Sequence, residues 1–164
     1  LFPTLVWNVN CSELLPEVIE VLNKTPWDPN NHIVSDGFIV LEKYKELTKE
    51  FEKIVNFALD DIKYSVPLKM TTSWFTNTIP GRRVEEHNHA NSFWSAVFYL
   101  QDSSPLVFFK DRVGVQVRSN TNQKDLRMDG GITIDAKEGH MLIFPSMIRH
   151  GSLFNTTPYS RYSL

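Results

Sequence analysis

The stretch 87–100 reads His-Asn-His-Ala-Asn-Ser-Phe-Trp-Ser-Ala-Val-Phe-Tyr-Leu, and it places two histidines directly before the most strand-like run of the chain. That run, 93–100, is rich in aromatic residues, which favour β-strands. If the chain is also extended at the histidines, residues two apart point to the same face, so His87 and His89 aim at one point in space. Two converging imidazoles predict a metal site.

Further strand-like stretches, separated by turn signals, follow one another from residue 68 to residue 164. Pro80-Gly81, Asp129-Gly130-Gly131 and Glu138-Gly139 are among these turn signals. Short strands at such spacing are typical of a sandwich or a jelly roll. The expected strands are 68–79, 93–100, 106–109, 113–117, 132–134, 141–144 and 159–164.

Two helices are expected before these strands. Ser12 is the expected N-cap of the first helix, which runs to about Asn23. Apolar residues at helical spacing predict the second helix from Leu41 to about Ile62. A short strand is expected within 2–10, ahead of both helices.

The chain has the length and composition of one globular domain, with 164 residues of which 41% are hydrophobic and 22% charged. Helices followed by a run of strands predict an α+β, mainly β fold, with a jelly-roll core and N-terminal helices packed on one sheet. Residues 1–164 are therefore expected to form a single domain, in which 1–66 is a helical support region and 67–164 is the jelly-roll core.

The net charge, the apolar runs and the cysteine count limit which partners and which compartment are expected. The 17 Lys and Arg residues against 19 Asp and Glu residues give a net charge of -2, so strong nonspecific binding to nucleic acid is not expected. No apolar run approaches the roughly 20 residues that cross a bilayer. The single cysteine, Cys11, cannot form an internal disulfide, which fits a cytoplasmic protein, and it has no histidine nearby in sequence to make it a nucleophile.

His150 adds a third candidate metal ligand, because it follows an apolar strand and a proline turn at a place where burial need not explain it. Non-haem iron(II) sites typically use two histidines and one carboxylate. Neutral imidazole also binds iron, zinc, copper and nickel, so the set His87, His89 and His150 is chemically reasonable. Glu85 is the alternative third ligand, because it shares the alternation of the histidine pair, whereas Glu86 should point away.

Arg161 and Ser163 form a candidate anion site near the end of the chain. They lie two apart on an expected strand, so a guanidinium fork and a hydroxyl point into the same cavity and suit a carboxylate. An ordinary salt bridge is the alternative for this arginine.

Together these motifs resemble the 2-oxoglutarate- and Fe(II)-dependent oxygenase superfamily, and more narrowly its oxygenases found in phages and marine bacteria. The similarity extends over about 68–164 and implies that the jelly roll is a double-stranded β-helix, also called cupin-like, in a single oxygenase domain. The motifs that carry it are Ser73-Trp74-Phe75-Thr76-Asn77, Gly81, His87-Asn88-His89, Phe93 to Leu100, Gly139 to His150 and Arg161-Tyr162-Ser163.

The resemblance implies an active site with Fe(II), 2-oxoglutarate and O₂. His87 and His150 match metal ligands, His89 stands where the family usually has Asp or Glu, and Arg161 with Ser163 matches the pair that binds the distal carboxylate of 2-oxoglutarate. The metal ligands and the arginine are the expected catalytic residues.

Asn77 and Tyr99 are further candidate partners for the co-substrate, because both offer hydrogen-bonding groups on neighbouring strand-like stretches. The expected reaction couples oxidative decarboxylation of 2-oxoglutarate to hydroxylation of an unidentified substrate, which is a protein side chain, a small metabolite or a nucleobase. The expected location is the cytoplasm, or the host cytoplasm for a phage protein.

Two other functions remain open at the level of sequence. One is a cupin-like three-histidine metal enzyme that does not use 2-oxoglutarate, and the other is a non-catalytic β-barrel binding module. The polar segment 118–127 is expected to be a loop that acts as a lid over the site.

Overall fold

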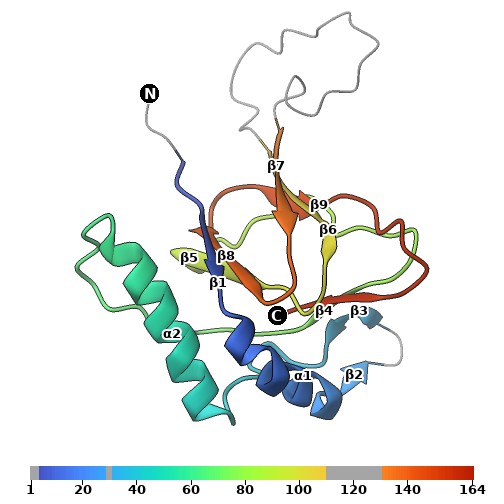
Figure 1. The fold of residues 1–164 in the computed structure, drawn as a ribbon, viewed down its shortest axis with the longest axis horizontal. Coiled ribbons are helices and arrows are strands. Elements are labelled where there is room, and N and C mark those ends of the chain that lie inside the picture. Colours follow the sequence, from blue (N-terminus) through green and yellow to red (C-terminus); the bar gives the residue numbers. More distant parts are fainter. Residues whose placement is uncertain (1–3, 29–30, 110–130) are drawn as a thin grey trace, which may run out of the picture.

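The structure, a computed structural model, describes residues 4–28, 31–109 and 131–164. The expected strand 113–117 and the expected lid 118–127 lie outside the described residues. Within the described part, the chain forms antiparallel sheets with two helices beside them (Figure 1).

In the described part of the chain, three sheets make up the core. The first contains β1 (Trp7–Asn10), β8 (His140–Pro145) and β5 (Trp94–Phe98), in that order. The second contains β10 (Arg161–Ser163), β4 (Thr76–Thr78), β3 (Asn31–Ser35) and β2 (Trp27–Asp28). The third contains β7 (Gly131–Ala136), β6 (Ser103–Phe109) and β9 (His150–Ser152).

Strands that are distant in sequence are neighbours in these sheets, as β1 with β8 and β4 with β10 show. All of the pairings between strands are antiparallel. This crossed order and the mainly β content agree with the predicted jelly roll. The region 1–66 contributes β1, β2 and β3 to the sheets as well as the helices.

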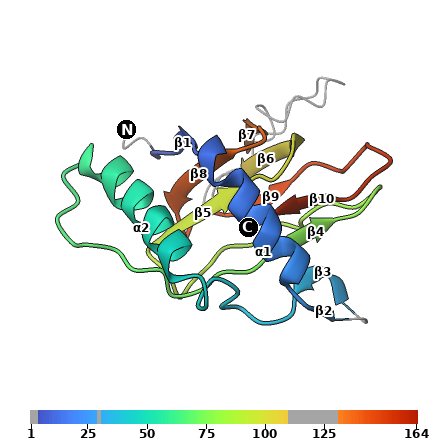
Figure 2. The same ribbon diagram turned by 60° about the horizontal axis from the view of Figure 1, so that its bottom comes forward.

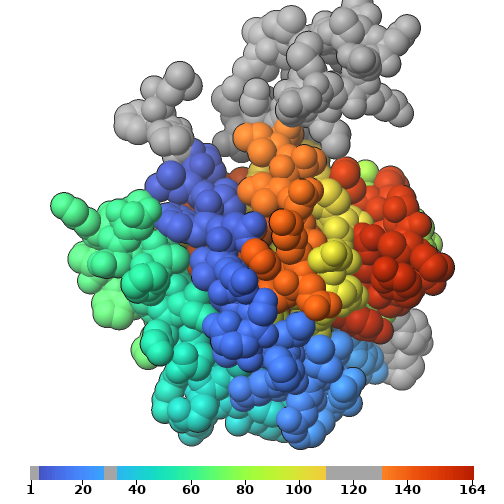
Figure 3. Space-filling view, viewed as in Figure 1, coloured from blue at the N-terminus to red at the C-terminus, as the bar shows by residue number. Residues whose placement is uncertain are grey.

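The helices α1 (Leu15–Lys24) and α2 (Lys45–Asp60) cover the same side of the molecule (Figure 2). Each buries one apolar stripe, which in α2 contains Leu47 and Phe51, four residues apart. The ring of Phe51 meets that of Phe98 on β5 edge to face, with 5.6 Å between centroids. The space-filling view shows β1 and α1 between α2 and the strand β7 (Figure 3).

Strand β8 lies at the centre of the core because both of its faces are buried. Met141 and Ile143 pack into the cluster that includes the two helices, whereas Leu142 and Phe144 face a second cluster with Phe108. Alternation along the strand sends successive side chains to opposite faces, so the unbroken apolar run joins two cores.

Several predicted boundaries differ from the structure. Ser12 does not cap α1 but begins a 3-10 turn, η1 (Ser12–Leu14), because its backbone N–H and hydroxyl both bond to the Asn10 side chain. The expected strand 68–79 is a strand only in β4, since the chain before it is held by side chains of α2. Strands β2, β3 and β9 had no strong signal in the sequence.

Cys11 is fully buried and has no disulfide partner. Burial, followed by the charge of Glu13, raises the pKa of its thiol to about 11, which leaves the reactive thiolate scarce at neutral pH. This environment agrees with the expected non-catalytic role. Neither helix of the described chain has the length and apolar character needed to span a membrane.

Candidate metal centre

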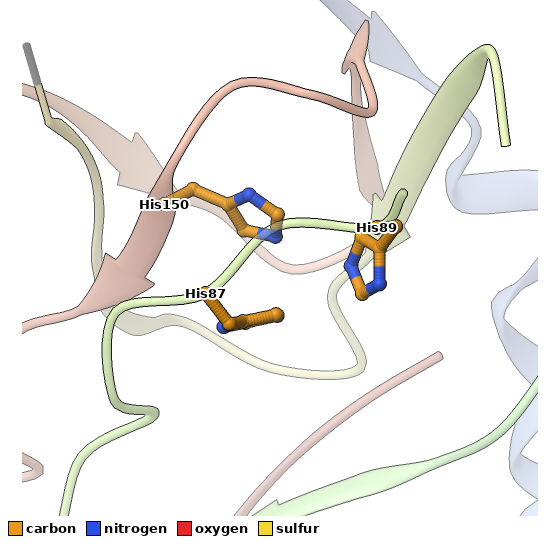
Figure 4. Close-up of side chains that lie close together, drawn as sticks. All are labelled: His87, His89 and His150. Carbon is orange, nitrogen blue, oxygen red and sulfur yellow. The ribbon is translucent and has the colours of Figure 1, made fainter. Parts of the chain in front are cut away.

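The fold brings His87, His89 and His150 together, and their potential ligand atoms all lie within 4.8 Å of one another (Figure 4). His87 and His150 form an antiparallel bridge, in which each backbone N–H donates to the carbonyl of the other residue at 2.9 and 2.8 Å. The backbone N–H of His89 donates to the carbonyl oxygen of Ser146 at 2.9 Å. The backbone therefore fixes the positions from which the three rings project.

Backbone carbonyls also set the tautomer of two of these rings. Nδ1 of His87 lies 2.8 Å from the carbonyl oxygen of Glu85, and Nδ1 of His150 lies 2.8 Å from that of Ile148. A carbonyl oxygen only accepts hydrogen bonds, so in the neutral rings Nδ1 carries the hydrogen and Nε2 keeps a free lone pair. Metal-binding histidines are commonly oriented in this way.

The surroundings favour neutral imidazole at the cluster. His150 is 2% exposed. Burial is the largest effect and lowers its pKa to about 4, although the hydrogen bond to the Ile148 carbonyl acts in the opposite direction; His87 and His89 add smaller downward contributions. Burial, and then the charge of His87, also lowers the pKa of His89. Because metal ions bind the unprotonated ring, these residues fit a cation at neutral pH.

The prediction that Glu85 shares the face of the histidine pair is wrong. Its carboxylate is exposed and pairs with Arg83 at 3.0 Å, while Glu86 pairs with Arg149 at 2.8 Å. The chain near His87 forms only an isolated bridge and no regular strand, so strict alternation does not extend back to Glu85. In the described ranges, no carboxylate joins the three-histidine group.

Gly151 is a residue of the site that the sequence reasoning missed. A Cβ atom at this position would lie 2.8 Å from the carbonyl oxygen of Val84. The missing side chain lets β9 approach the segment that carries His87, and the ring centroids of His87 and His150 lie 4.3 Å apart. Its place directly after a candidate ligand was the available signal.

A cavity of about 400 Å³ adjoins the three rings. It extends along β5 to α2 and to the segment 68–74, and Tyr99 and Ser163 also line it. A volume in this range is usual for sites that bind small molecules.

Arg161 and Ser163 share one face of β10, as expected from their spacing. Across the sheet Arg161 pairs with Thr78 and Ser163 with Thr76, and both threonines line the cavity. Arg161 is 9% exposed, and its Nη1 donates a hydrogen bond to the Ser104 hydroxyl at the cavity wall.

Among the described residues, two buried donors in this region have no hydrogen-bond partner, Nε of Arg161 and the hydroxyl of Tyr99, and the acceptor Oδ1 of Asn77 also has none. Tyr99 is 4% exposed, and burial raises the pKa of its hydroxyl, which stays a neutral donor. Buried donors without acceptors are costly, so this pair fits an anionic or carbonyl-bearing ligand.

Asn77 does not line the cavity, although Thr76 and Thr78 on either side of it do. Its cross-strand partner is Tyr162, whose ring packs against Trp27 on the side of the helices. Because successive residues of a strand face opposite ways, Asn77 lies on the face opposite to Thr76 and Thr78, and this register does not support the co-substrate contact expected of it.

A jelly roll that brings three imidazoles together, with a buried arginine in the same region, fits a metal-dependent enzyme that takes an anionic ligand. Residues 72–164 match the profile of a family described as "Putative 2OG-Fe(II) oxygenase". The chain belongs to this family and is a 2-oxoglutarate- and Fe(II)-dependent oxygenase, as its motifs predicted. Fe(II) and 2-oxoglutarate are accordingly its cofactor and co-substrate.

Solved structures confirm the fold class. The chain is similar to the non-heme alpha ketoglutarate dependent carbocyclase SnoK from nogalamycin biosynthesis, with a TM-score of 0.66 and 15% identity over 98% of this chain and 78% of SnoK. An oxidoreductase of the 2OG-Fe(II) oxygenase family from Burkholderia pseudomallei gives a TM-score of 0.68 at 12% identity, over 98% of this chain and 81% of the oxidoreductase.

HygX from Streptomyces hygroscopicus, solved with nickel, 2-oxoglutarate and hygromycin B bound, gives a TM-score of 0.62 at 11% identity, over 98% of this chain and 80% of HygX. No curated protein sequence matches this chain.

Proposed function

We propose that His87, His89 and His150 hold Fe(II), that Arg161, Ser163 and Tyr99 hold 2-oxoglutarate, and that the enzyme hydroxylates a substrate C–H bond. The observation that carries this proposal is the convergence of the three imidazoles, with ligand atoms within 4.8 Å of one another, beside the cavity. The products are the hydroxylated substrate, succinate and CO₂.

The donor set fits iron. The carbonyls of Glu85 and Ile148 hold two rings in the tautomer that offers Nε2, and the burial of His150 keeps it unprotonated. Three neutral ligands would leave the full charge of Fe(II), and the proximal carboxylate of 2-oxoglutarate would offset part of it, while the distal carboxylate pairs with Arg161. Bound Fe(II) supplies the oxidation of the C–H bond by O₂, coupled to decarboxylation of 2-oxoglutarate.

The protein contributes binding and orientation for the co-substrate. The guanidinium of Arg161, oriented by the Ser104 hydroxyl, binds the distal carboxylate together with Ser163. The Tyr99 hydroxyl donates a further hydrogen bond from the buried wall of the cavity. The apolar surroundings limit the access of water to the reacting groups.

We propose further that residues 1–164 act as one oxygenase domain, in which 1–66 supports the core 67–164. The pairing of β1 with β8 and of β3 with β4 supports this unity, because it joins the first region to the core through hydrogen bonds. A cytoplasmic location is supported by the unpaired Cys11, and weak nonspecific affinity for nucleic acid by the net charge of -2.

Succinate formation from 2-oxoglutarate, measured with and without Fe(II), tests the metal ligands. We expect His87→Ala to lose both Fe(II) binding and succinate formation. His140→Ala is the matched control, since His140 bonds to the Asn8 side chain and lies outside the cluster. Equal metal binding by the two variants would contradict the assignment.

Binding of 2-oxoglutarate tests the second part of the site. Arg161→Ala should raise the dissociation constant of 2-oxoglutarate at least about a hundredfold, because a charge-assisted bidentate contact is lost. Arg83→Ala serves as the control, because Arg83 forms an exposed pair with Glu85. If both variants bind 2-oxoglutarate like the wild type, Arg161 is not the anchor.

A further inference from the structure

The end of the cavity toward α2 offers no free charge to a substrate. Histidines aside, the only charged side chains among the described lining residues are Glu52 and Lys69. These two pair with each other at 3.0 Å, and the other carboxylate oxygen of Glu52 accepts the backbone N–H of Met70 at 2.8 Å. Both charges are therefore already in use by the protein.

The wall beside the metal centre is aromatic. The ring of Trp74 meets that of His89 edge to face, with 5.4 Å between centroids. On the outer side, Phe38 meets Trp74 in the same way at 5.7 Å. Trp74 thus touches a candidate ligand ring and lines the cavity at the same time.

Apolar groups continue from this wall in both directions. Phe93 lines the cavity yet is 81% exposed, so it stands at the mouth, where a bound molecule would cover it. Apart from Glu52, Lys69 and the histidines, the polar lining groups at this end of the cavity are neutral. The apolar side chains toward α2 are Leu41, Phe51, Val55, Leu68 and Met70.

We propose that the prime substrate presents an uncharged, apolar group to this enzyme, that this group lies against Trp74 beside His89, and that Trp74 determines substrate specificity. The proposal rests on the proposed function, which assigns to 2-oxoglutarate the end of the cavity lined by Ser104 and Ser163, where Arg161 bonds to the Ser104 hydroxyl. The α2 end remains for the substrate.

The physical reason is the cost of placing a charge there. A charged group that enters an apolar wall loses its hydration and finds no unpaired counter-charge among the described lining residues. An aromatic or aliphatic group gains contact with the Trp74 indole and releases water. The position next to the proposed metal ligands should therefore bind apolar substrate groups and disfavour charged ones.

Calorimetric titration with three naphthalene probes of similar size tests the proposal: 1-naphthalenemethanol, which is neutral, 1-naphthoate and 1-naphthylmethylammonium. The full chain is loaded with Zn(II) and saturated with 2-oxoglutarate. We expect the neutral probe to bind at least about tenfold more tightly than either charged probe. Equal or tighter binding of a charged probe would overturn the proposal.

Variants locate the binding position. Trp74→Ala should weaken binding of the neutral probe about tenfold, and Trp74→Phe should restore most of it, because an aromatic face remains. Trp27→Phe is the matched control, since Trp27 packs against Tyr162 and does not line the cavity. An unchanged affinity in Trp74→Ala would remove Trp74 from the specificity site.

The two proposals fail in different ways. Binding of 2-oxoglutarate to the Zn(II)-loaded protein is titrated first, and its absence overturns the proposed co-substrate site. The probe series is then also run without 2-oxoglutarate. If the neutral probe is preferred and this preference depends on Trp74, the proposed apolar position is supported whether or not 2-oxoglutarate binds. If the preference is absent both with and without 2-oxoglutarate, the apolar position is overturned and the co-substrate site is not affected.

Discussion

At the scale of single residues, Gly151 controls how closely two ligand-bearing segments approach each other. It follows His150 on β9, and its α-carbon faces the backbone at Val84 and Glu85. The same backbone supplies the carbonyl that holds the His87 ring. A glycine, which has no side chain, therefore allows the close spacing of two rings that we propose to bind the metal.

Gly151→Ala should weaken metal binding. The new methyl group would lie 2.8 Å from the Val84 carbonyl oxygen, so the two segments must separate and the His87 and His150 rings move apart. We expect a loss of about 1–3 kcal/mol in the free energy of unfolding and at least about a tenfold loss in Zn(II) affinity, measured by denaturation and by competition with a chelator.

Gly81→Ala is the control for this substitution. A methyl group at Gly81 meets no atom within 4 Å, although the φ of +73° makes any side chain there unfavourable. Gly81→Ala should therefore lower stability and leave Zn(II) affinity intact. A Gly151→Ala variant with wild-type metal affinity would show that this close approach does not position the ligands.

At the scale of elements, α2 holds the cavity wall in place. Asn56 accepts the backbone N–H of Leu68 at 2.7 Å and donates to its carbonyl oxygen at 3.1 Å. Glu52, one turn earlier on the same face, binds the backbone N–H of Met70 and the Lys69 ammonium group. These contacts replace the sheet hydrogen bonds that the segment lacks, and they keep Leu68 and Met70 against the cavity.

The Glu52 contacts should make stability depend on pH. Burial is the largest single effect and acts to raise the pKa of Glu52. The Met70 N–H and Lys69 act in the opposite direction and together outweigh burial, so the pKa of Glu52 lies below the usual 4.5. The folded state thus binds this proton more weakly than the unfolded state does. The stabilisation is present above pH 4.5 and is lost as the pH falls through the lowered pKa.

Glu52→Gln should consequently lower the free energy of unfolding by about 1 kcal/mol at neutral pH, and the difference from wild type should shrink toward zero in acid. Urea denaturation at a series of pH values measures this. Glu50→Gln, which alters an exposed pair with Lys53, should show no such trend. A difference that does not depend on pH would contradict the assigned role of the carboxylate charge.

At the scale of the whole molecule, the proposed metal centre joins parts of the chain that are far apart. His87 and His89 precede β5 of the first sheet, whereas His150 begins β9 of the third. Arg161 lies on β10 of the second sheet. The site therefore exists only when the sheets are assembled, and a bound metal stabilises that assembly.

Metal removal should accordingly lower the melting temperature. At a free Zn(II) concentration about 100 times the dissociation constant, binding contributes about 2.7 kcal/mol, which corresponds to roughly 5–10 °C for a domain of this size. Differential scanning calorimetry with Zn(II) and with a chelator measures the shift. His89→Ala should abolish it and His140→Ala should retain it, whereas an equal shift in both would place the metal elsewhere.

Local patterns predicted much of the architecture and the site. The apolar stripe in 41–62 predicted α2, and the strand-like runs predicted β5, β6, β7, β8 and β10, with errors at their ends. The spacing of Arg161 and Ser163 predicted a shared face, which the register with Thr78 and Thr76 bears out. Each of these features depends on residues close in sequence, whose relative directions follow from the regular geometry of strands and helices.

Predictions failed where the chain is irregular or where a distant segment decides. Glu85 turns to solvent because the backbone near the histidines is not a regular strand, and Asn77 pairs with Tyr162 on the face of the sheet opposite to Arg161 and Ser163. The contacts of Glu52 and Asn56 with 68–70 were not predictable from either segment alone.

The sequence by itself determined which chemical groups are available: three imidazoles, a guanidinium with a hydroxyl two residues later, and the apolar runs that form the core. Only the tertiary structure decided that the imidazoles meet with no carboxylate of the described residues beside them, and that Tyr99 and Trp74 adjoin the same cavity. The physical reason is that side-chain direction follows local geometry, whereas the meeting of distant segments depends on packing and on backbone approaches such as the one at Gly151.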